Sequence, residues 1–89
     1  MIYEIRYTKV AKKDLTYIKQ AKLNAKLKKI LEILTKNPYQ NPPPFEKLVG
    51  ELKECYSRRI NIRHRLIYKV DEEKKQIKIL SVWTHYEKI

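Results

Sequence analysis

A proline-rich stretch near the middle of the chain separates two halves with different patterns. Residues 37–44 read Asn-Pro-Tyr-Gln-Asn-Pro-Pro-Pro. Proline fixes φ and lacks the backbone N–H, so this stretch can neither continue a helix nor join a central strand. We therefore expect a stiff connector that ends the element before it and delivers the chain to a new one.

The half before the connector predicts one strand and two helices. Residues 2–7 are rich in β-formers, and Thr8 after them is a suitable helix N-cap. Apolar residues then recur at helical spacing from Lys9 to about Gln20. A second helix is predicted by a longer apolar stripe, made of Leu23, Leu27, Ile30, Leu31 and Leu34. It should close at Asn37, because the residue before a proline is pushed out of helical dihedrals.

The half after the connector predicts strands. Gly50, the only glycine, permits a turn before a strand at residues 54–60. Two more strands are expected at residues 64–70 and 76–84, joined by the charged turn 71–75. Strand, helix, helix and then three or four antiparallel strands make an α+β fold. With 89 residues, the chain can bury one modest core, so residues 1–89 should form a single domain.

Side-chain sorting selects the register of the first hairpin, since a slip of one residue moves every side chain to the other face. A two-residue turn would mix arginine with apolar residues on both faces. A three-residue loop at residues 61–63 separates them. One face, which we call the core face, then carries Tyr56, Ile60, Leu66, Tyr68 and Val70, and the other, the open face, carries Ser57, Arg59, Arg65 and Lys69.

This register leaves two misfits, Arg58 on the core face and Ile67 on the open face. It also places Arg59 directly opposite Arg65, which costs roughly 0.2–1 kcal/mol for like charges. A fold tolerates such a pair more readily if an anion binds between the two guanidinium groups. The alternative is that both arginines extend into solvent.

The chain is strongly basic, with a net charge of +11, and this predicts a polyanionic ligand such as nucleic acid or an acidic protein. Residues 9–36 contain nine lysines and two acidic residues. Such helices can also be no more than solvated faces. Arginine matches phosphate with a planar fork of donors, so the better candidate for a specific phosphate site is the cluster Arg58, Arg59, Arg63 and Arg65.

Other classes are disfavoured by what the sequence lacks. Cys55 is the only cysteine, and no apolar run has the length of a signal sequence or a membrane span, so we expect a cytoplasmic protein without membrane contact. One cysteine and two histidines are too few for a structural zinc site, and we expect no metal and no cofactor.

Three stretches resemble the YoeB/Txe toxins of the RelE-like mRNA interferases. They are Tyr56-Ser57-Arg58-Arg59-Ile60, His64-Arg65-Leu66-Ile67-Tyr68 and Trp83-Thr84-His85-Tyr86. The similarity spans nearly the whole chain, because the basic helical half, the connector ending in Phe45-Glu46-Lys47-Leu48 and the terminal His-Tyr follow the family's order. The resemblance implies two N-terminal helices packed on a twisted antiparallel sheet of four to five strands, with the active residues on its exposed concave side.

The resemblance also implies a function. It is that of the toxin of a type II toxin–antitoxin system, which cleaves mRNA in the ribosomal A site without a metal, using the ribose 2′-hydroxyl of the substrate as the nucleophile. The implied partners are mRNA, the 30S A site with its rRNA, and an acidic antitoxin of the YefM/Axe type. A homodimer is compatible with the family but is not indicated by these residues.

The family's site residues can be carried over where the motifs match. Glu46 matches the general base, His85 the general acid and Arg65 the main stabiliser of the transition state. Tyr86 matches the tyrosine that positions the substrate or stacks on a base. Arg59 is expected to assist in binding phosphate. Without the resemblance, Glu46 would read as an ordinary surface glutamate.

Two further residues near these motifs are expected to be structural. His64 falls on the core side of the register, where a histidine with its hydrogen bonds satisfied is the more common outcome. Trp83 is more typical of a core or sheet-face residue than of a base-stacking one.

Two departures from the family pattern bear on the site. Val49 stands where some relatives carry a lysine, three residues after the glutamate. Any help from such a lysine must come from Lys47 or be absent, and we expect Lys47 to bind phosphate or RNA. Residues 87–89, Glu-Lys-Ile, follow the His-Tyr pair, and a carboxylate there could raise the pKa of His85 or occupy the cleft.

Two other functions fit the composition. One is a non-catalytic RNA- or ribosome-binding module, although a single glycine excludes the KH and RRM motifs. The other is a ParE-like toxin that acts on DNA gyrase, against which the set Glu46, His85 and Tyr86 argues.

Overall fold

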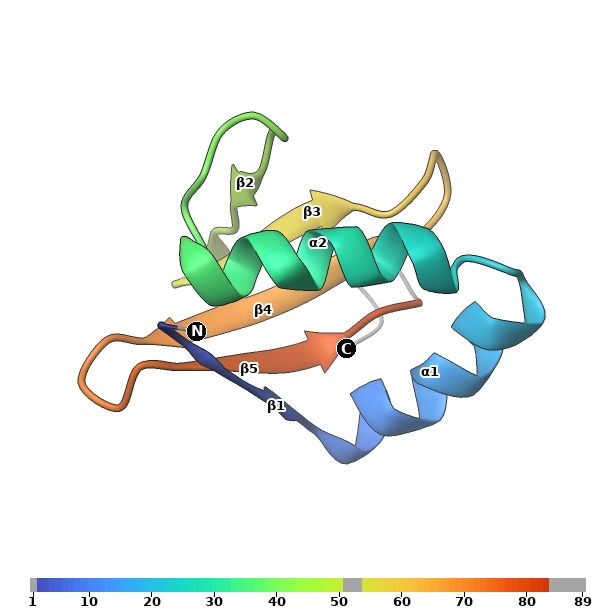
Figure 1. Cartoon of the computed structure of the whole chain (residues 1–89), viewed down its shortest axis with the longest axis horizontal. Coiled ribbons are helices and arrows are strands. Elements are labelled where there is room, and N and C mark those ends of the chain that lie inside the picture. The colour runs from blue at the N-terminus through green and yellow to red at the C-terminus, as the bar shows by residue number, and fades with distance from the viewer. Residues whose placement is uncertain (1, 51–53, 84–89) are drawn as a thin grey trace.

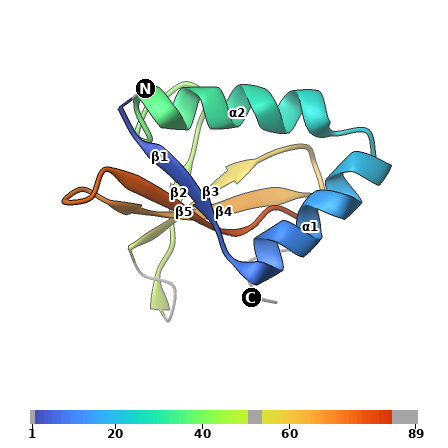
Figure 2. The same ribbon diagram turned by 60° about the horizontal axis from the view of Figure 1, so that its bottom comes forward.

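The computed structural model describes residues 2–50 and 54–83. Its elements follow the predicted order: β1 (Glu4–Tyr7), α1 (Lys9–Gln20), α2 (Asn24–Lys36), β2 (Glu46–Lys47), β3 (Cys55–Arg59), β4 (Arg65–Asp71) and β5 (Gln76–Ser81). In Figures 1 and 2, α2 lies across one face of the sheet and α1 connects it to β1. The predicted α+β fold with two N-terminal helices on a five-stranded sheet is confirmed.

The sheet is mixed rather than antiparallel throughout. Its strand order is β1-β5-β4-β3-β2, and every pair from β2 to β5 is antiparallel. Only β1 departs, because it pairs in parallel with β5 from Glu4 opposite Gln76 to Tyr7 opposite Ile79. Strands β1 and β2 lie at opposite edges of the sheet, and the two helices connect them. The last strand, β5, therefore lies next to β1.

The predicted register of the first hairpin is confirmed. Arg59 lies opposite Arg65, and Tyr56 lies opposite Tyr68. The loop at residues 61–63 is closed by Asn61, whose Oδ1 accepts hydrogen bonds from the backbone N–H of Arg63 at 2.9 Å and of His64 at 2.8 Å. This side chain explains the three-residue loop, because asparagine can replace a backbone carbonyl in a turn.

The main core lies between the two helices and the core face of the sheet. Thr8 caps α1 as predicted, with its Oγ1 accepting from the backbone N–H of Ala11 at 3.1 Å. The side chains buried in this core come from both layers and include Ala11, Ile18, Leu27, Leu34, Leu66, Tyr68, Ile77 and Ile79. Neither α1 nor α2, the helices of the described residues, is long and apolar enough to cross a membrane.

A second, smaller core explains Ile67. This residue lies on the open face and is nevertheless fully buried, together with Leu48 and Cys55, and Leu80 packs against them. Leu48 extends the line of β2, with its backbone N–H bonded to the carbonyl of Cys55 at 2.9 Å. This small core covers one end of the open face, and Arg59 and Arg65 lie at the other end.

Strands β1 and β5 are shorter than predicted because groups outside the sheet take part in the hydrogen bonds at their ends. Residues 2 and 3 donate their backbone N–H groups to the carbonyl of Thr35 on α2, so β1 starts at Glu4. At the other end, the hydroxyl of Ser81 and the backbone N–H of Val82 donate to Asp14 of α1, at 3.0 and 3.3 Å. Strand β5 therefore ends at Ser81 instead of residue 84, and Val82 and Trp83 form a bend.

Candidate active site

Three of the predicted site residues share the open face of the sheet. Glu46 of β2 is paired with Ser57, and Arg59 of the same strand as Ser57 is paired with Arg65. Paired residues on adjacent strands point to the same face, as do residues two apart on one strand. Glu46, Arg59 and Arg65 are therefore brought together by three neighbouring strands, on the face turned away from α2.

Glu46 and Arg65 form an ion pair across the intervening strand. Glu46 Oε1 lies 3.8 Å from Arg65 Nη1, and the exposed fraction of the side chain is 65% for Glu46 and 17% for Arg65. Because β3 lies between β2 and β4, the two side chains meet above β3, in the region of Ser57 and Arg59. A partly exposed pair at this distance contributes about 0–1 kcal/mol, so Glu46 can exchange its partner readily.

Lys47 does not join this group. Its register partner is Tyr56, a core-face residue, so the backbone directs the Lys47 side chain away from Glu46. The alternation of a strand requires this, because adjacent residues point to opposite faces. Lys47 therefore lies on the other face of β2 from Glu46. Its expected role in binding phosphate or RNA stays a prediction, and it would have to act from that face.

His85 and Tyr86, the predicted acid and substrate-positioning residue, lie outside the described residues. The described chain reaches Trp83, whose carbonyl oxygen lies 2.9 Å from Nδ1 of His64. The rings of His64 and Trp83 are stacked with their centroids 3.8 Å apart. This contact and the stacking are compatible with the structural roles expected for His64 and Trp83. They place Trp83 beside His64, the residue before Arg65.

Arg58 is not a phosphate ligand, although it belongs to the predicted arginine cluster. Its exposed fraction is 1%, and its guanidinium donates to the carbonyls of the connector at Pro43, Gln40 and Pro38, at 2.6, 2.8 and 3.1 Å. Its carbon Cζ also lies 4.8 Å from the centre of the Phe45 ring. Arg58 thus anchors the proline connector at the point where it delivers Glu46 to the sheet.

The anchor includes the hydroxyl of Tyr68. This hydroxyl accepts from Nε of Arg58 at 3.1 Å and donates to the carbonyl of Pro38 at 2.8 Å. Burial raises the pKa of Tyr68, so the phenol keeps the proton that it donates. The sequence did not predict that Arg58 and Tyr68 anchor the connector. The one indication was that the predicted register placed Arg58, a charged residue, on the core face.

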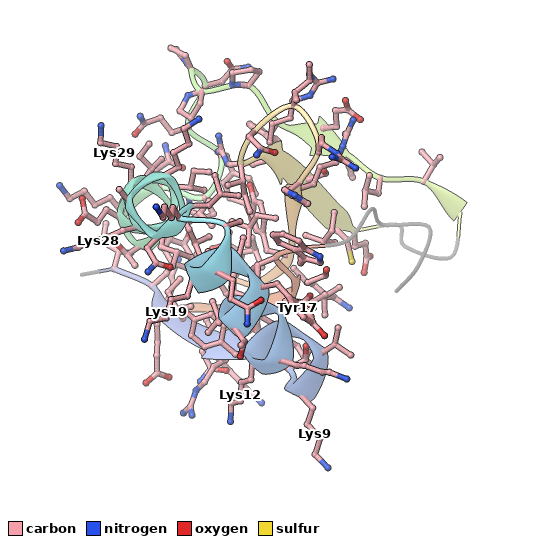
Figure 3. All side chains as sticks on the ribbon, turned by 90° about the vertical axis from the view of Figure 1, so that its right-hand side faces the viewer. Lys9, Lys12, Tyr17, Lys19, Lys28 and Lys29 are labelled. Carbon is pink, nitrogen blue, oxygen red and sulfur yellow. The ribbon has the colours of Figure 1, made fainter. Side chains whose placement is uncertain are left out.

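The charged surface of the helices lies apart from the arginines of the open face. Figure 3 shows Lys9, Lys12, Lys19, Lys28 and Lys29 extending outward from α1 and α2, and all five are exposed. Within residues 2–50 and 54–83, no group of three histidine, cysteine, aspartate or glutamate side chains could hold a metal ion. The described site thus offers a carboxylate and two guanidinium groups.

The fold is that of the RelE-like toxins, as solved structures show. The structure of YafQ from Escherichia coli strain BL21(DE3) has a TM-score of 0.79 with this chain, with 21% identity and 98% of each chain covered. The YoeB–YefM complex from Staphylococcus aureus gives a TM-score of 0.79 at 36% identity, over 94% of this chain and 98% of that chain. The YoeB dimer from the same organism gives 0.79 at 34% identity, over 97% and 100%.

The particular family follows from the sequence. Residues 7–86 match the profile of the YoeB-like toxins of bacterial type II toxin–antitoxin systems. The chain belongs to this family, which confirms the resemblance drawn from its motifs. No curated protein sequence matches the chain.

Proposed function

We propose that this toxin is a ribosome-dependent endoribonuclease that cuts mRNA in the A site and so inhibits translation. The observation that carries the proposal is the meeting of Glu46 with Arg65 on the open face, at 3.8 Å, with Arg59 directly opposite Arg65. Attack by a ribose 2′-hydroxyl on its own phosphodiester needs a base near that hydroxyl and positive charge around the phosphate. These three side chains are of the types required.

The proposed reaction uses the substrate's own nucleophile. Glu46 takes the proton from the 2′-hydroxyl, the 2′-oxygen forms a bond to the adjacent phosphorus, and the bond to the 5′-oxygen of the next nucleotide breaks. His85 donates a proton to that 5′-oxygen, and Tyr86 positions the substrate. The products are a 2′,3′-cyclic phosphate and a 5′-hydroxyl, and neither step needs a metal or a cofactor.

The ion pair of the free protein fits this role. When a substrate phosphate binds to Arg65 and Arg59, it replaces the Glu46 carboxylate as the partner of the Arg65 guanidinium. Glu46 is then available to accept a proton from the nearby 2′-hydroxyl. The phosphate also relieves the repulsion between the two arginines that the register places opposite each other.

The test is cleavage of a reporter mRNA in a translating extract, with the cuts mapped by primer extension. Wild-type protein should cut within the A-site codon. Glu46→Gln should lower the cleavage rate by about 10²- to 10⁴-fold, the usual contribution of a general base. The matched control is Glu73→Gln, which changes an exposed glutamate of the β4–β5 turn and should leave the rate unchanged.

Two outcomes would support other functions. Ribosome binding by the wild type with no cleavage would favour the non-catalytic binding module. A gyrase-dependent DNA damage response on expression would favour the ParE-like function. Either result, with no mRNA cuts, contradicts the nuclease proposal.

We also propose that an acidic antitoxin of the YefM type silences this toxin in the cytoplasm, where ribosomes are found. The net charge of +11 supports this, because an acidic segment would be attracted to the protein and could cover Arg59 and Arg65. A solved YoeB from S. aureus is described as a complex with YefM, and another as a dimer. By analogy with that dimer, we propose that this chain can form a homodimer, which analytical ultracentrifugation can test.

A further inference from the structure

Ser57 carries a buried hydroxyl that has no hydrogen-bond partner. The exposed fraction of the residue is 2%, and its Oγ is the only buried side-chain nitrogen or oxygen of the described residues left without a partner. Folded proteins rarely leave a buried hydroxyl unsatisfied, because it loses its hydrogen bonds to water and gains none in return. The buried hydroxyl of Ser81, by contrast, donates to Asp14 at 3.0 Å.

The position of Ser57 links this hydroxyl to the candidate site. Ser57 is the register partner of Glu46 on one side and of Ile67 on the other. Arg59 is two residues further along the same strand and shares its face. The ion pair of Glu46 and Arg65 passes above this part of β3, so Ser57 lies beneath the carboxylate that we propose as the base.

Open space adjoins Ser57. A pocket of about 150 Å³ lies between the proline connector and β3. It is lined by Ser57, Glu46 and Arg59, by Pro43, Pro44 and Phe45 at the end of the connector, and by Arg58 and Ile30 of α2. Ser57 and Glu46 thus line the same pocket.

We propose that Ser57 is a further substrate-binding residue, whose hydroxyl donates a hydrogen bond to the ribose 2′-oxygen. This inference rests on the proposed function. The 2′-hydroxyl must approach Glu46 to lose its proton, and Ser57 is the nearest residue to Glu46 across the sheet. As the proton passes to Glu46, negative charge develops on the 2′-oxygen, and a donor already in place stabilises it. Ser57 keeps its own proton throughout.

The ion pair must open for this to happen, and its geometry allows it. The distance of 3.8 Å is longer than a hydrogen bond, and the side chain of Glu46 is 65% exposed. Binding of the substrate phosphate at Arg65 would release the carboxylate to the 2′-hydroxyl, beside Ser57. The hydroxyl is thus unsatisfied in the free protein and satisfied in the complex.

The experiment compares activity with stability in Ser57→Ala, using the full chain on ribosomes programmed with mRNA. The single-turnover cleavage rate should fall by about 10- to 100-fold, while the affinity for the ribosome stays close to that of the wild type. The thermal midpoint should be unchanged or higher, because the deleted hydroxyl has no partner in the folded protein. A purely structural serine would instead lower the midpoint.

Ser81→Ala is the matched control for stability. It removes a buried hydroxyl that donates to Asp14, so its thermal midpoint should fall. If Ser57→Ala does not fold, Ser57→Cys tests the same point, since a thiol has a similar size and is a much weaker donor.

The outcomes separate this inference from the proposed function. If the wild type does not cut mRNA, the proposed function fails. If the wild type cuts, Glu46→Gln does not, and Ser57→Ala cuts at the wild-type rate, then the nuclease function stands and the role of Ser57 is wrong. A lowered thermal midpoint in Ser57→Ala would also overturn it, because the hydroxyl would then have a structural partner.

Discussion

Arg58 shows how a single buried cation can organise a loop. Its guanidinium makes hydrogen bonds to three connector carbonyls and to the hydroxyl of Tyr68, and no carboxylate in the part of the chain that the structure describes is paired with it. Prolines cannot donate backbone hydrogen bonds, so a proline-rich connector offers mainly carbonyl acceptors. Arginine, with five donors and no acceptor, is the side chain that matches such a segment.

Replacing Arg58 should therefore cost far more than replacing the arginine beside it. Arg58→Met would leave the carbonyls of Pro38, Gln40 and Pro43 without their donor, and we expect a loss of about 3–5 kcal/mol in the free energy of unfolding. Arg59→Met, at an exposed site, should change it by no more than about 0.5 kcal/mol. Urea denaturation measures both, and similar losses in the two variants would show that the anchor does not exist.

Asp14 joins two elements, α1 and the end of β5. Its carboxylate, with the residue 5% exposed, accepts from the hydroxyl of Ser81 and the backbone N–H of Val82. Asp14→Ala should cost about 1–3 kcal/mol in the free energy of unfolding, since both donors would be left unsatisfied. Asp14→Asn keeps an acceptor and should lose less. Lys13→Ala, at the exposed neighbouring position, is the control, and a loss as large as that of Asp14→Ala would refute the explanation.

Glu72 ties the β4–β5 turn to two other segments and gives the fold a dependence on pH. It accepts hydrogen bonds from the hydroxyls of Tyr39 and Tyr3 and from Nζ of Lys75. These bonds, that from Tyr39 above all, hold the pKa of Glu72 below its ordinary value of 4.5. A carboxyl whose pKa is lowered by folding stabilises the protein above that ordinary value, and the contribution is lost as the pH falls through the lowered pKa.

We therefore expect the difference in unfolding free energy between wild type and Glu72→Gln to be constant near neutral pH. It should shrink as the pH falls below the ordinary value of 4.5. Denaturation curves over a pH series measure this difference. Glu73→Gln, beside it in the same turn, is the control for the loss of one carboxyl group. A difference between wild type and Glu72→Gln that grows at acid pH would contradict the assignment.

Much of the fold could be predicted from local patterns in the sequence. The connector, the apolar stripe of the second helix and the sorting of side chains in the hairpin each depend on residues close together in the chain, and these predictions were correct. The parallel pairing of β1, the early end of β5 and the burial of Ile67 depend on contacts between distant segments. Periodicity carries no information about such contacts.

The site could also be predicted only in part, because some of its features depend on contacts between distant segments. The register places Arg59 opposite Arg65, and the family motif supplies Glu46. The sequence did not show that Lys47 points to the other face, since this follows from how the two-residue strand β2 pairs with β3. Nor did it single out Ser57, whose missing hydrogen-bond partner is visible only in three dimensions.

At the scale of the whole molecule, we expect the positive charge of the helices to govern binding to the ribosome but not the rate of mRNA cleavage. Lys9, Lys12, Lys19, Lys28 and Lys29 are exposed and extend outward from α1 and α2 (Figure 3). These helices pack on the core face of the sheet, whereas Arg59 and Arg65 lie on the open face. Affinity for ribosomes should fall with salt concentration. In Lys28→Gln/Lys29→Gln the slope of log affinity against log salt should become less steep, by about one for each lysine that contacts a phosphate.

The cleavage rate of the bound complex should be unchanged in that double variant. Lys28→Arg/Lys29→Arg keeps the charge and should retain the wild-type slope. A lower single-turnover rate in the glutamine variant at saturating ribosome would contradict this separation of binding from chemistry.

The chemical nature of the cut ends tests the central claim most directly. The products of cleavage on the ribosome can be analysed for their termini, with a second mRNA that carries a 2′-deoxyribose at the scissile nucleotide. We predict a 2′,3′-cyclic phosphate on the upstream fragment, a 5′-hydroxyl on the downstream fragment and no cleavage of the deoxy substrate. A 3′-hydroxyl with a 5′-phosphate, or cutting at the deoxy position, would show that the 2′-hydroxyl is not the nucleophile and that Glu46 is not its base.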